Sequence, residues 1–283
     1  MNKNKRVSIV IPVYNEEERL GACLHAIAAQ TVEPFEVIVV DNNSTDNTAA
    51  VARLYPFVAV LQEKRQGVVY ARTTGFNAAS GDIIGRIDAD TVLAPDWVES
   101  LEQIFSDKGV DAVSGAITYH DLPNRQLFGK VELFFRSRIA KKMGDEVFLY
   151  GANMAIRKSA WRKARPHLCN AGGMHEDFDL AIHAEEAGAH VVFDKSLRAD
   201  VSLRRFDTNI RDFWQYALLN PRTYKLHGRK SQRAMYTVIF LVLAFYWALK
   251  IMHRGYDTET GRFSWQKVFA STVPRVNPAT FVD

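Results

Sequence analysis

The chain contains 283 residues, of which 47% are hydrophobic and 24% are charged. This composition is that of a globular protein and excludes a disordered, collagen-like or disulfide-stabilised chain. The formal net charge of +4 is too small for this length to indicate nucleic-acid binding, and we expect none. The two cysteines, Cys23 and Cys169, lie far apart in the sequence. They indicate neither a disulfide framework nor a cysteine-based zinc site, and they fit a reducing compartment.

The N-terminal residues 1–6 are basic, and an apolar run follows from Val7 to Val13. This run is shorter than a secretory signal requires, and no small-residue cleavage site follows it. We therefore expect a buried first strand and a cytoplasmic protein.

Strand and helix patterns alternate through the first half of the chain. Short runs rich in β-branched residues predict strands at residues 7–11, 35–40, 58–61 and 83–87. Helical spacing predicts helices at residues 20–28 and 67–79, and a further helix that carries Val51 and Leu54 and is capped by Ser44, Thr45 or Asp46. This alternation predicts an α/β fold with right-handed crossovers and a mostly parallel sheet.

The order is looser after residue 110. Strands are predicted at residues 110–118 and 150–156, and helices at 127–143 and 176–187. From His227 onward a basic stretch precedes an unusually apolar run. We therefore predict an α/β domain over residues 1–225 and a C-terminal extension over residues 226–283.

Three polar clusters follow predicted strands, at the sheet edge where open α/β sheets bind ligands. They are Tyr14-Asn15-Glu16, Asp41-Asn42-Asn43 and Asp88-Ala89-Asp90. Neither G-x-G-x-x-G after the first strand nor G-x-x-x-x-G-K-[ST] anywhere is present, which excludes two familiar nucleotide sites. Hard cations such as Mg²⁺ or Mn²⁺ prefer carboxylate oxygens, often together with substrate phosphates. The residues alone leave open whether Asp88 and Asp90 bind a metal or form a solvated turn.

Six segments in order resemble the motifs of the family 2 glycosyltransferases, which have the GT-A fold. The resemblance extends over roughly residues 6–205 and rests on Val10–Glu16, Val39–Asp46, Gly75–Asp82, Asp88–Asp90, Gly151–Arg157 and His175–Leu180. It implies a Rossmann-like, mixed but mostly parallel sheet flanked by helices, here with a C-terminal helical extension.

The resemblance also implies a nucleotide-binding region. The loop that carries Pro12, Tyr14 and Glu16 would hold the base and ribose together with Asp41, and Arg72 would approach the base or the diphosphate. Each of these residues has an ordinary structural alternative. Tyr14 would then be a buried aromatic, Asp41 a helix N-cap and Arg72 a surface ion pair.

Catalytic roles follow from the same resemblance. Asp88 would lie near the ribose and the metal, and Asp90 would bind the metal, Mn²⁺ or Mg²⁺, directly. Glu176 and Asp177 open a predicted helix whose dipole stabilises carboxylates there. The resemblance makes Asp177 the catalytic base and Glu176 a supporting residue. His175 beside them is expected to be a surface or supporting histidine.

The implied reaction is metal-dependent, inverting transfer of a sugar from a nucleotide-diphosphate sugar, UDP- or GDP-linked, to a hydroxyl of a glycan or lipid-linked acceptor. Processive members carry Gln-x-x-Arg-Trp, which residues 215–222 do not match, so we expect transfer of a single sugar. A polyprenyl-phosphate sugar transferase and an inactive nucleotide-sugar-binding protein are the alternatives. A sugar-nucleotide pyrophosphorylase would need a Gly-rich N-terminal loop, which the sequence lacks.

Residues 234–249 carry no charge and are flanked by basic residues on both sides. As one helix they would measure about 24 Å, which is short of the ~30 Å hydrocarbon core. Basic flanks and aromatic ends favour a helix at an anionic membrane surface, so we expect peripheral contact with the inner face of the cell membrane. The alternative is burial against the catalytic domain or against a second subunit in a homodimer.

Overall fold

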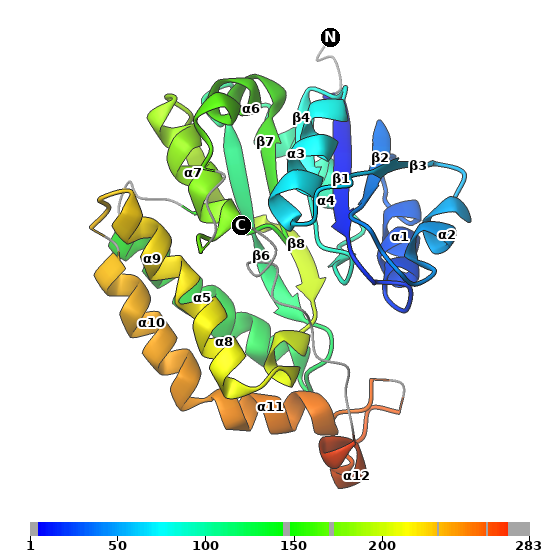
Figure 1. Cartoon of the computed structure of the whole chain (residues 1–283), viewed down its shortest axis with the longest axis vertical. Coiled ribbons are helices and arrows are strands. Elements are labelled where there is room, and N and C mark those ends of the chain that lie inside the picture. Colours follow the sequence, from blue (N-terminus) through cyan, green and yellow to red (C-terminus); the bar gives the residue numbers. More distant parts are fainter. Residues whose placement is uncertain (1–4, 144–147, 170–172, 231, 259, 271–283) are drawn as a thin grey trace. The chain divides into compact units, whose positions relative to one another are not determined.

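The computed structural model describes residues 5–143, 148–169, 173–230, 232–258 and 260–270 (Figure 1). The chain forms two compact units. The first comprises residues 1–116, 147–170 and 176–200, and the second comprises residues 117–146, 171–175 and 201–283. The domain boundary predicted near residue 225 falls inside the second unit, and the assignment of residues 1–225 to one catalytic domain stays a prediction.

A single eight-stranded sheet runs in the order β3-β2-β1-β4-β7-β6-β8-β5. Its strands are β1 Val7–Val13, β2 Glu36–Asp41, β3 Val58–Gln62, β4 Ile83–Arg86, β5 Val92–Leu93, β6 Ala112–Tyr119, β7 Met154–Arg157 and β8 Val191–Val201. Strands β3, β2, β1 and β4 pair in parallel, whereas β7 is antiparallel to both β4 and β6. The predicted mixed, mostly parallel α/β sheet is confirmed.

Helices of the first unit cover both faces of the sheet (Figure 1). They are α1 Leu20–Ala28, α2 Thr48–Arg53, α3 Val68–Ala78, α4 Trp97–Ile104, α6 Lys158–Ala164 and α7 Glu176–Glu186. Alternate residues of a strand point to opposite faces. Ile9 and Ile11 therefore pack in the core with α1 and α4, and Val10 packs in the core with α3, α6 and α7. Each fully buried side chain of this size contributes about 1.5–3 kcal/mol.

Helix α3 lies unusually close to the parallel strands. A Cβ atom on Gly75 would lie 2.3 Å from a methyl group of Val10 and 2.9 Å from one of Val40. Only glycine permits this approach, because any other side chain would push α3 away from β1 and β2. The close approach of α3 to the sheet also holds Arg72, on the same helix, in its buried position.

The second unit is mainly helical. It contains α5 Arg125–Met143, α8 Ile210–Ala217, α9 Leu219–Leu226, α10 Gln232–Ala244, α11 Tyr246–Gly255 and α12 Trp265–Phe269, and a short 3₁₀ turn at Arg204–Asp207 precedes α8. Its core is built from Leu122, Leu203, Phe206, Phe213 and Tyr246. Aromatic rings supply most of this core, which the sequence analysis did not identify.

The apolar run at 234–249 does not form one helix, so that expectation is wrong. Phe245 leaves the helical conformation with ψ near 0° and separates α10 from α11. The break places Tyr246 in the core, where its hydroxyl donates to the Thr208 carbonyl at 2.6 Å. Among the described residues, no helix combines the length and the apolarity needed to cross a bilayer.

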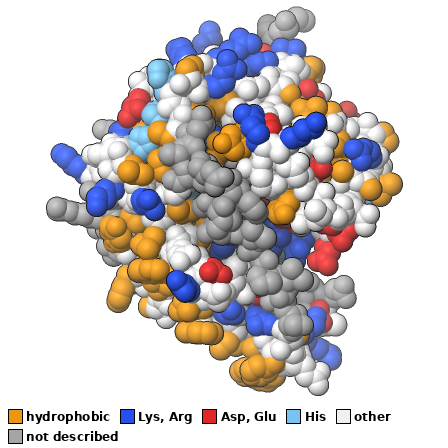
Figure 2. All heavy atoms as spheres, in the orientation of Figure 1, with side chains coloured by type: hydrophobic (Ala, Val, Ile, Leu, Met, Phe, Trp, Pro, Cys, Tyr) orange, Lys and Arg blue, Asp and Glu red, His pale blue; other side chains and the backbone are white. Residues whose placement is uncertain are grey.

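One side of α10 and α11 packs inward and the other is exposed. Met235 and Ile239 are buried, whereas Phe240 is 71% and Trp247 is 59% exposed. Figure 2 shows hydrophobic side chains gathered over this part of the second unit. We call the exposed side chains Tyr236, Phe240, Phe245 and Trp247 the aromatic surface.

Candidate functional site

The loops after β1 and β2 are joined by hydrogen bonds at the carboxyl edge of the sheet. Asn15 adopts φ = 54°, a left-handed conformation that asparagine tolerates. Its side-chain oxygen accepts from the Thr45 N–H at 2.8 Å, and its own N–H donates to the Ser44 hydroxyl at 3.1 Å. The Glu16 N–H donates to the Thr48 hydroxyl at 2.7 Å. The two loops therefore form one connected edge.

The predicted nucleotide-binding residues of these loops lie together. Pro12 pairs with Val40 in the sheet, and Val13 pairs with Asp41, the last residue of β2. Tyr14 is half-buried directly after β1, and Glu16 is buried. The edge of the sheet thus collects an aromatic ring and two buried carboxylates.

Asp41 does not cap a helix. Its side chain accepts from the Ser44 N–H at 3.1 Å, while α2 begins later with Asn47 at its N-cap position. Of the three residues expected to cap this helix, Asp46 accepts from the N–H of Thr48, the first residue of α2, at 2.9 Å, whereas Ser44 and Thr45 are held by hydrogen bonds to Asn15.

Asn42 holds the loop that leads into α3. Its side-chain nitrogen donates to the carbonyls of Glu63 at 2.9 Å and Arg65 at 2.7 Å, and its oxygen accepts from the Gly67 N–H at 2.7 Å. This bridge connects the end of β2 to the start of the helix that carries Arg72.

Arg72 is 1% exposed, so it is not a surface ion pair. Its guanidinium donates to the Glu176 carbonyl at 2.7 Å, at the first turn of α7. Burial lowers the pKa of Arg72, and the nearby charges of Asp177 and Glu176 oppose that shift. The contact supports the end of α7 that carries Asp177, the predicted catalytic base, and Glu176, the predicted supporting residue.

A second buried arginine, Arg86, joins β4 to α7. Its guanidinium pairs with Asp177, with Asp88 at 3.2 Å and with Glu176 at 3.3 Å. Burial alone would lower the pKa of Arg86, but the charges of Asp177, Asp88 and Glu176 together raise it. Three predicted site carboxylates, from two chain segments about 90 residues apart, therefore meet at one guanidinium.

A glycine makes the position of Asp177 possible. The Gly151 N–H donates to Asp177 at 2.9 Å. A Cβ atom at Gly151 would fall 1.9 Å from Arg86 and 2.4 Å from Asp177, so a side chain there would displace the ion pair. The strand predicted from residue 150 begins only at Met154, because residues 150–153 turn to bring this N–H to Asp177.

Asp88 and Asp90 lie in the turn after β4, closed by the Thr91 N–H and the Asp88 carbonyl at 3.1 Å. Asp90 is buried, and the Asp88 side chain is 26% exposed. The Cys23 thiol of α1 donates to the Asp88 carbonyl at 3.8 Å. The helix that follows the β1 loop is therefore in contact with the β4 turn, and burial together with the charges of Asp90, Asp88 and Glu16 raises the pKa of this thiol.

Asn153 in the Gly151–Arg157 segment has a structural role. Its side-chain nitrogen donates to the carbonyls of Ala116 at 2.8 Å and Leu197 at 3.0 Å, and its oxygen accepts from the Trp97 indole at 2.8 Å. It is fully buried. These bonds fix the turn that presents Gly151.

His175 belongs to the second unit. Its N–H donates to the Thr223 hydroxyl at 2.8 Å, and its imidazole lies 3.1 Å from the Tyr216 hydroxyl. It is buried, so it is not a surface histidine.

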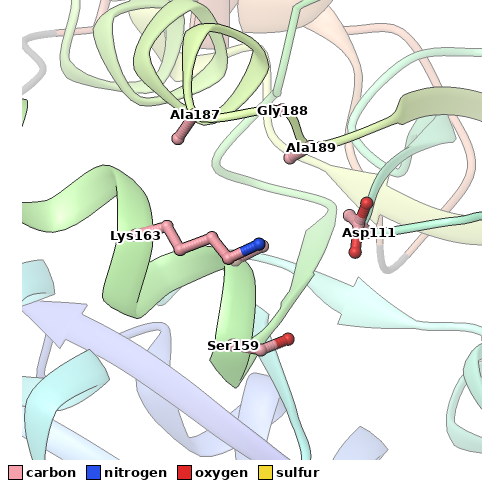
Figure 3. A pocket seen from close by; sticks show the side chains of 7 residues that line it. Asp111, Ser159, Lys163, Ala187, Gly188 and Ala189 are labelled. Atoms are coloured by element: carbon pink, nitrogen blue, oxygen red, sulfur yellow. The ribbon is translucent and has the colours of Figure 1, made fainter.

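A small hollow elsewhere in the first unit contains none of the predicted site residues. Figure 3 shows Ser159 and Lys163 of α6 facing Asp111 and the turn after α7. No described contact connects this hollow to the carboxylate cluster, and we assign it no role.

Neither Arg86 nor Gly151 was assigned a role from the sequence, although Gly151 begins one of the six segments that resemble the family. The sequence does offer one indication of Arg86. It is a charged residue at the end of an otherwise apolar strand, two positions before Asp88. Chemically, the assembled site offers carboxylate oxygens for a divalent cation at Asp88 and Asp90, and a hydrogen-bonded carboxylate at Asp177.

Comparison with known proteins identifies the family. Residues 8–164 match the family described as "Glycosyl transferase family 2". Glycosyltransferase AglE of Haloferax volcanii is 29% identical over 197 residues, which cover 66% of this chain and 64% of that protein. The Glucosyl-dolichyl phosphate glucuronosyltransferase of the same organism is 25% identical over 234 residues, 74% of this chain and 75% of that protein.

A solved structure agrees on the fold. The mannosyltransferase PcManGT from Pyrobaculum calidifontis, in complex with GDP-Man and Mn²⁺, superposes with a TM-score of 0.63 at 20% identity. The match covers 87% of this chain and 70% of that one. The chain spans just under two thirds of AglE, and the family match alone covers more than half of the chain. Together with the GT-A sheet and the carboxylates at its edge, these matches establish that the chain belongs to glycosyl transferase family 2.

Proposed function

We propose that the chain transfers a single sugar from a nucleotide-diphosphate sugar to an acceptor hydroxyl, with inversion and with the help of a divalent cation. One observation carries this proposal. Asp88, Glu176 and Asp177 meet at Arg86, at the edge of the sheet where open α/β folds bind ligands.

The joined loops after β1 and β2 are suited to the nucleotide. Pro12, Tyr14 and Glu16 lie next to Asp41 across the β1–β2 pairing. The Tyr14 ring would stack on the base, and the Asp41 carboxylate would accept a base N–H. Arg72 would act indirectly, because its buried guanidinium holds the Glu176 carbonyl. The base is uracil or guanine, and the PcManGT complex contains GDP-Man.

Asp88 and Asp90 have the chemistry of a Mn²⁺ or Mg²⁺ site, since both supply hard oxygen donors from one short turn. Asp88, Glu176 and Asp177 gather around Arg86, so the carboxylates of the β4 turn and of α7 lie close enough to act on one bound group. With such a cation bound, the charge that develops on the departing diphosphate is offset. The fold neighbour PcManGT was solved with Mn²⁺.

Asp177 is proposed as the general base. The acceptor hydroxyl would give its proton to the Asp177 carboxylate while the hydroxyl oxygen attacks the anomeric carbon from the face opposite the leaving diphosphate, which inverts the configuration. Arg86 and the Gly151 N–H orient that carboxylate. Glu176 shares Arg86 and would support the geometry.

A lipid-linked sugar is the acceptor class that we favour. The name of one relative includes a glucosyl-dolichyl phosphate, which is a sugar carried on a lipid phosphate. The exposed aromatic side chains of α10 and α11, the aromatic surface, are of the type that membrane interfaces bind. We therefore propose peripheral membrane contact through this surface. A free polyprenyl phosphate as acceptor is the second candidate, because it would use the same surface.

The test is an incubation of the full chain with UDP- and GDP-linked sugars and Mn²⁺ or Mg²⁺, with and without a lipid-linked sugar acceptor. We expect one nucleotide class to raise the melting temperature only with a cation present, and to release nucleoside diphosphate only with acceptor. Binding without release in the presence of every acceptor class would favour an inactive nucleotide-sugar-binding protein. The absence of both binding and release would contradict the proposal.

A further inference from the structure

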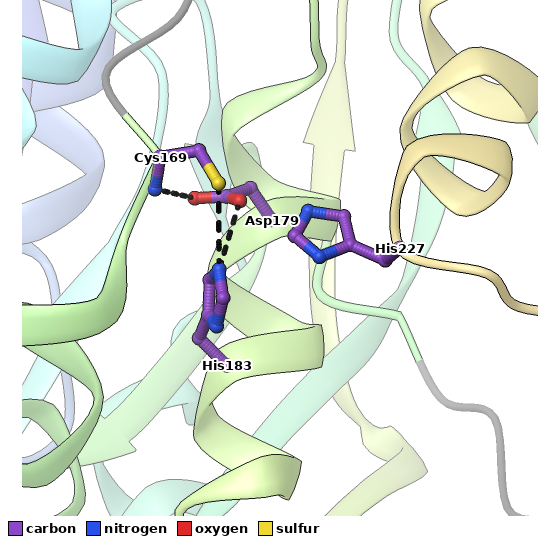
Figure 4. A group of neighbouring side chains, drawn as sticks. All are labelled: Cys169, Asp179, His183 and His227. Carbon is purple, nitrogen blue, oxygen red and sulfur yellow. Dashed lines mark hydrogen bonds and ion pairs between the residues drawn. The ribbon is translucent and has the colours of Figure 1, made fainter.

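Three metal-binding types of side chain meet at helix α7, and the proposed sugar transfer uses none of them. Cys169 Sγ lies 3.6 Å from His183 Nε2, and the same nitrogen lies 3.4 Å from Asp179 Oδ1. Each of the three residues offers one atom that could bind a metal, and these atoms lie within 4.8 Å of one another. Figure 4 shows the three side chains directed at one another.

Local structure brings them together. Asp179 and His183 are four residues apart on α7, so their side chains share one face of the helix. Cys169 follows the 3₁₀ turn at Arg165–His167, and its N–H donates to Asp179 Oδ2 at 3.1 Å. The sequence indicates no cysteine-based zinc site because only one cysteine takes part. The fold places an aspartate and a histidine next to this cysteine.

The separations match those of a tetrahedral zinc ion. Zinc binds sulfur at about 2.3 Å, and nitrogen or carboxylate oxygen at about 2.0–2.2 Å. At tetrahedral angles these lengths place sulfur about 3.6 Å from nitrogen, and nitrogen about 3.4 Å from oxygen. Cys169, His183 and Asp179 show these two separations.

The histidine is also oriented as metal-binding histidines are. Its other ring nitrogen, His183 Nδ1, lies 3.1 Å from Glu186 Oε2. A carboxylate at that position fixes the tautomer that leaves Nε2 free of a proton and increases its basicity toward a metal. Glu186 therefore has the position of a residue that orients a metal-binding histidine.

A nucleophilic cysteine is the competing interpretation, because Cys, His and Asp also form catalytic triads. In such a triad the histidine contacts the nucleophile through one ring nitrogen and the aspartate through the other. Here Cys169 Sγ and Asp179 Oδ1 both lie next to Nε2 of His183, which disfavours a Cys-His-Asp triad and is the arrangement expected of ligands around one ion.

The geometry points to a zinc site in which Cys169, Asp179 and His183 bind the ion and Glu186 orients His183. The thiolate and imidazole select Zn²⁺ rather than the hard cations that suit Asp88 and Asp90. The first unit supplies three ligands of a four-coordinate ion, and a water or a further donor takes the fourth position. The ion would fasten the segment before α7 to the second turn of that helix. This site does not depend on the proposed transferase activity.

The test uses Co²⁺ as a spectroscopic substitute for Zn²⁺ in the full chain after removal of metal by a chelator. A tetrahedral cobalt–thiolate complex absorbs by charge transfer from sulfur, whereas Co²⁺ bound to carboxylates alone does not. We expect one equivalent of Co²⁺ to produce this band, and one equivalent of Zn²⁺ to abolish it and raise the melting temperature.

Variants assign the ligands. Cys169→Ser should remove the charge-transfer band, and Cys23→Ser, which changes the chain's other cysteine, should keep it. Asp90→Ala should also keep it, which separates this site from the proposed catalytic cation site. Glu186→Gln should retain the band but weaken Zn²⁺ binding by about 10- to 100-fold.

Two results would overturn the proposal. The first is a wild-type chain that binds Co²⁺ without a thiolate band or does not bind it at all. The second is a band that survives in a folded Cys169→Ser protein, with folding checked by circular dichroism. The wild-type spectrum decides the question even where a variant fails to fold.

Discussion

The two compact units each contain a charge cluster, and the two clusters differ in composition. In the first unit, Arg86 faces the carboxylates of Asp88, Glu176 and Asp177. In the second, His253 lies between Asp121 at 3.2 Å and Asp207 at 3.1 Å. Arg254 adds a further positive charge 3.9 Å from Asp207.

The difference separates the proposed site from a structural cluster. Buried charges are stable when they are paired, so His253 and Arg254 together with Asp121 and Asp207 can fasten helix α11 to the turn before α8. Several carboxylates gathered at the edge of a sheet can in addition bind a cation or a substrate group.

The largest expected effect comes from Asp90→Ala. Loss of one carboxylate from a two-carboxylate site removes much of the charge that holds a divalent cation, so sugar transfer and cation-dependent nucleotide binding should be abolished while the fold persists. Activity assays and nucleotide titrations with and without Mn²⁺ measure this. Asp96→Ala is the matched control, because Asp96 is an exposed aspartate paired with Arg198 at 2.9 Å. Full activity of the Asp90 variant would place the metal elsewhere.

Asp177→Asn should lower kcat by roughly 10²–10⁴-fold with donor affinity near normal, because an amide cannot accept the proton of the acceptor hydroxyl. Glu176→Gln, which alters the neighbouring carboxylate on the same arginine, should cost less. Steady-state kinetics and donor titrations separate the two effects. A collapse of donor affinity with unchanged kcat would show that Asp177 binds the nucleotide instead.

Arg86→Met should lower the free energy of unfolding by about 3–5 kcal/mol, because it removes the guanidinium that pairs with the buried Asp177 and with the partly exposed Asp88 and Glu176. Urea unfolding measures this. Arg86→Lys keeps the charge and should lose less. Added Mn²⁺ should recover part of the loss if the carboxylates of this cluster bind a cation. An unchanged unfolding midpoint in Arg86→Met would remove the contrast between the two clusters.

The fold and the positions of Asp41, Asp88 and Asp90 could be predicted because they depend on local patterns. Runs of β-branched residues indicate buried strands, and polar residues directly after parallel strands meet at one edge. Arg86 could not be placed in the same way, since its partners on α7 lie far along the chain. The break in the helix at Phe245 could not be predicted either. It depends on the hydrogen bond from Tyr246 to the Thr208 carbonyl, and the hydrophobic pattern of the sequence does not indicate that these two residues share a core.

The His253 cluster should make stability depend on alkaline pH. Burial alone would lower the pKa of His253, but hydrogen bonds to Asp121 and Asp207 raise it to about 9 from 6.5. A pKa raised by folding gives a stabilisation that is complete below 6.5 and is lost as the pH rises through about 9. This loss should be about 3 kcal/mol.

Chemical unfolding at pH 6 to 10 measures that dependence, and His253→Gln should flatten it. Lys250, which donates to the Thr208 carbonyl at 2.9 Å, and Arg254 also face this cluster. A wild-type curve that is flat between pH 6.5 and 9 would contradict the pairing.

The smallest expected effect concerns the membrane. The basic residues expected after the apolar run are engaged inside the second unit, since Lys250 contacts Thr208 and His253 contacts Asp121 and Asp207. The basic residues before α10 would therefore make most of the contacts with anionic lipid. The aromatic surface would lie at the boundary between headgroups and acyl chains.

Replacing Arg229 and Lys230 with glutamine should weaken binding to anionic vesicles by up to ~1 kcal/mol per residue, and high salt should weaken wild-type binding by screening the same charges. Co-sedimentation with vesicles measures both effects. Arg53→Gln with Lys108→Gln is the matched control, because it removes two exposed basic residues from the first unit. Phe240→Ser should reduce the binding that remains at high salt, because that part depends on the aromatic surface. A chain that stays in solution with vesicles at low salt but forms a dimer, and becomes monomeric with Phe240→Ser, would instead assign the aromatic surface to a second copy. The acceptor would then be sought among soluble glycans.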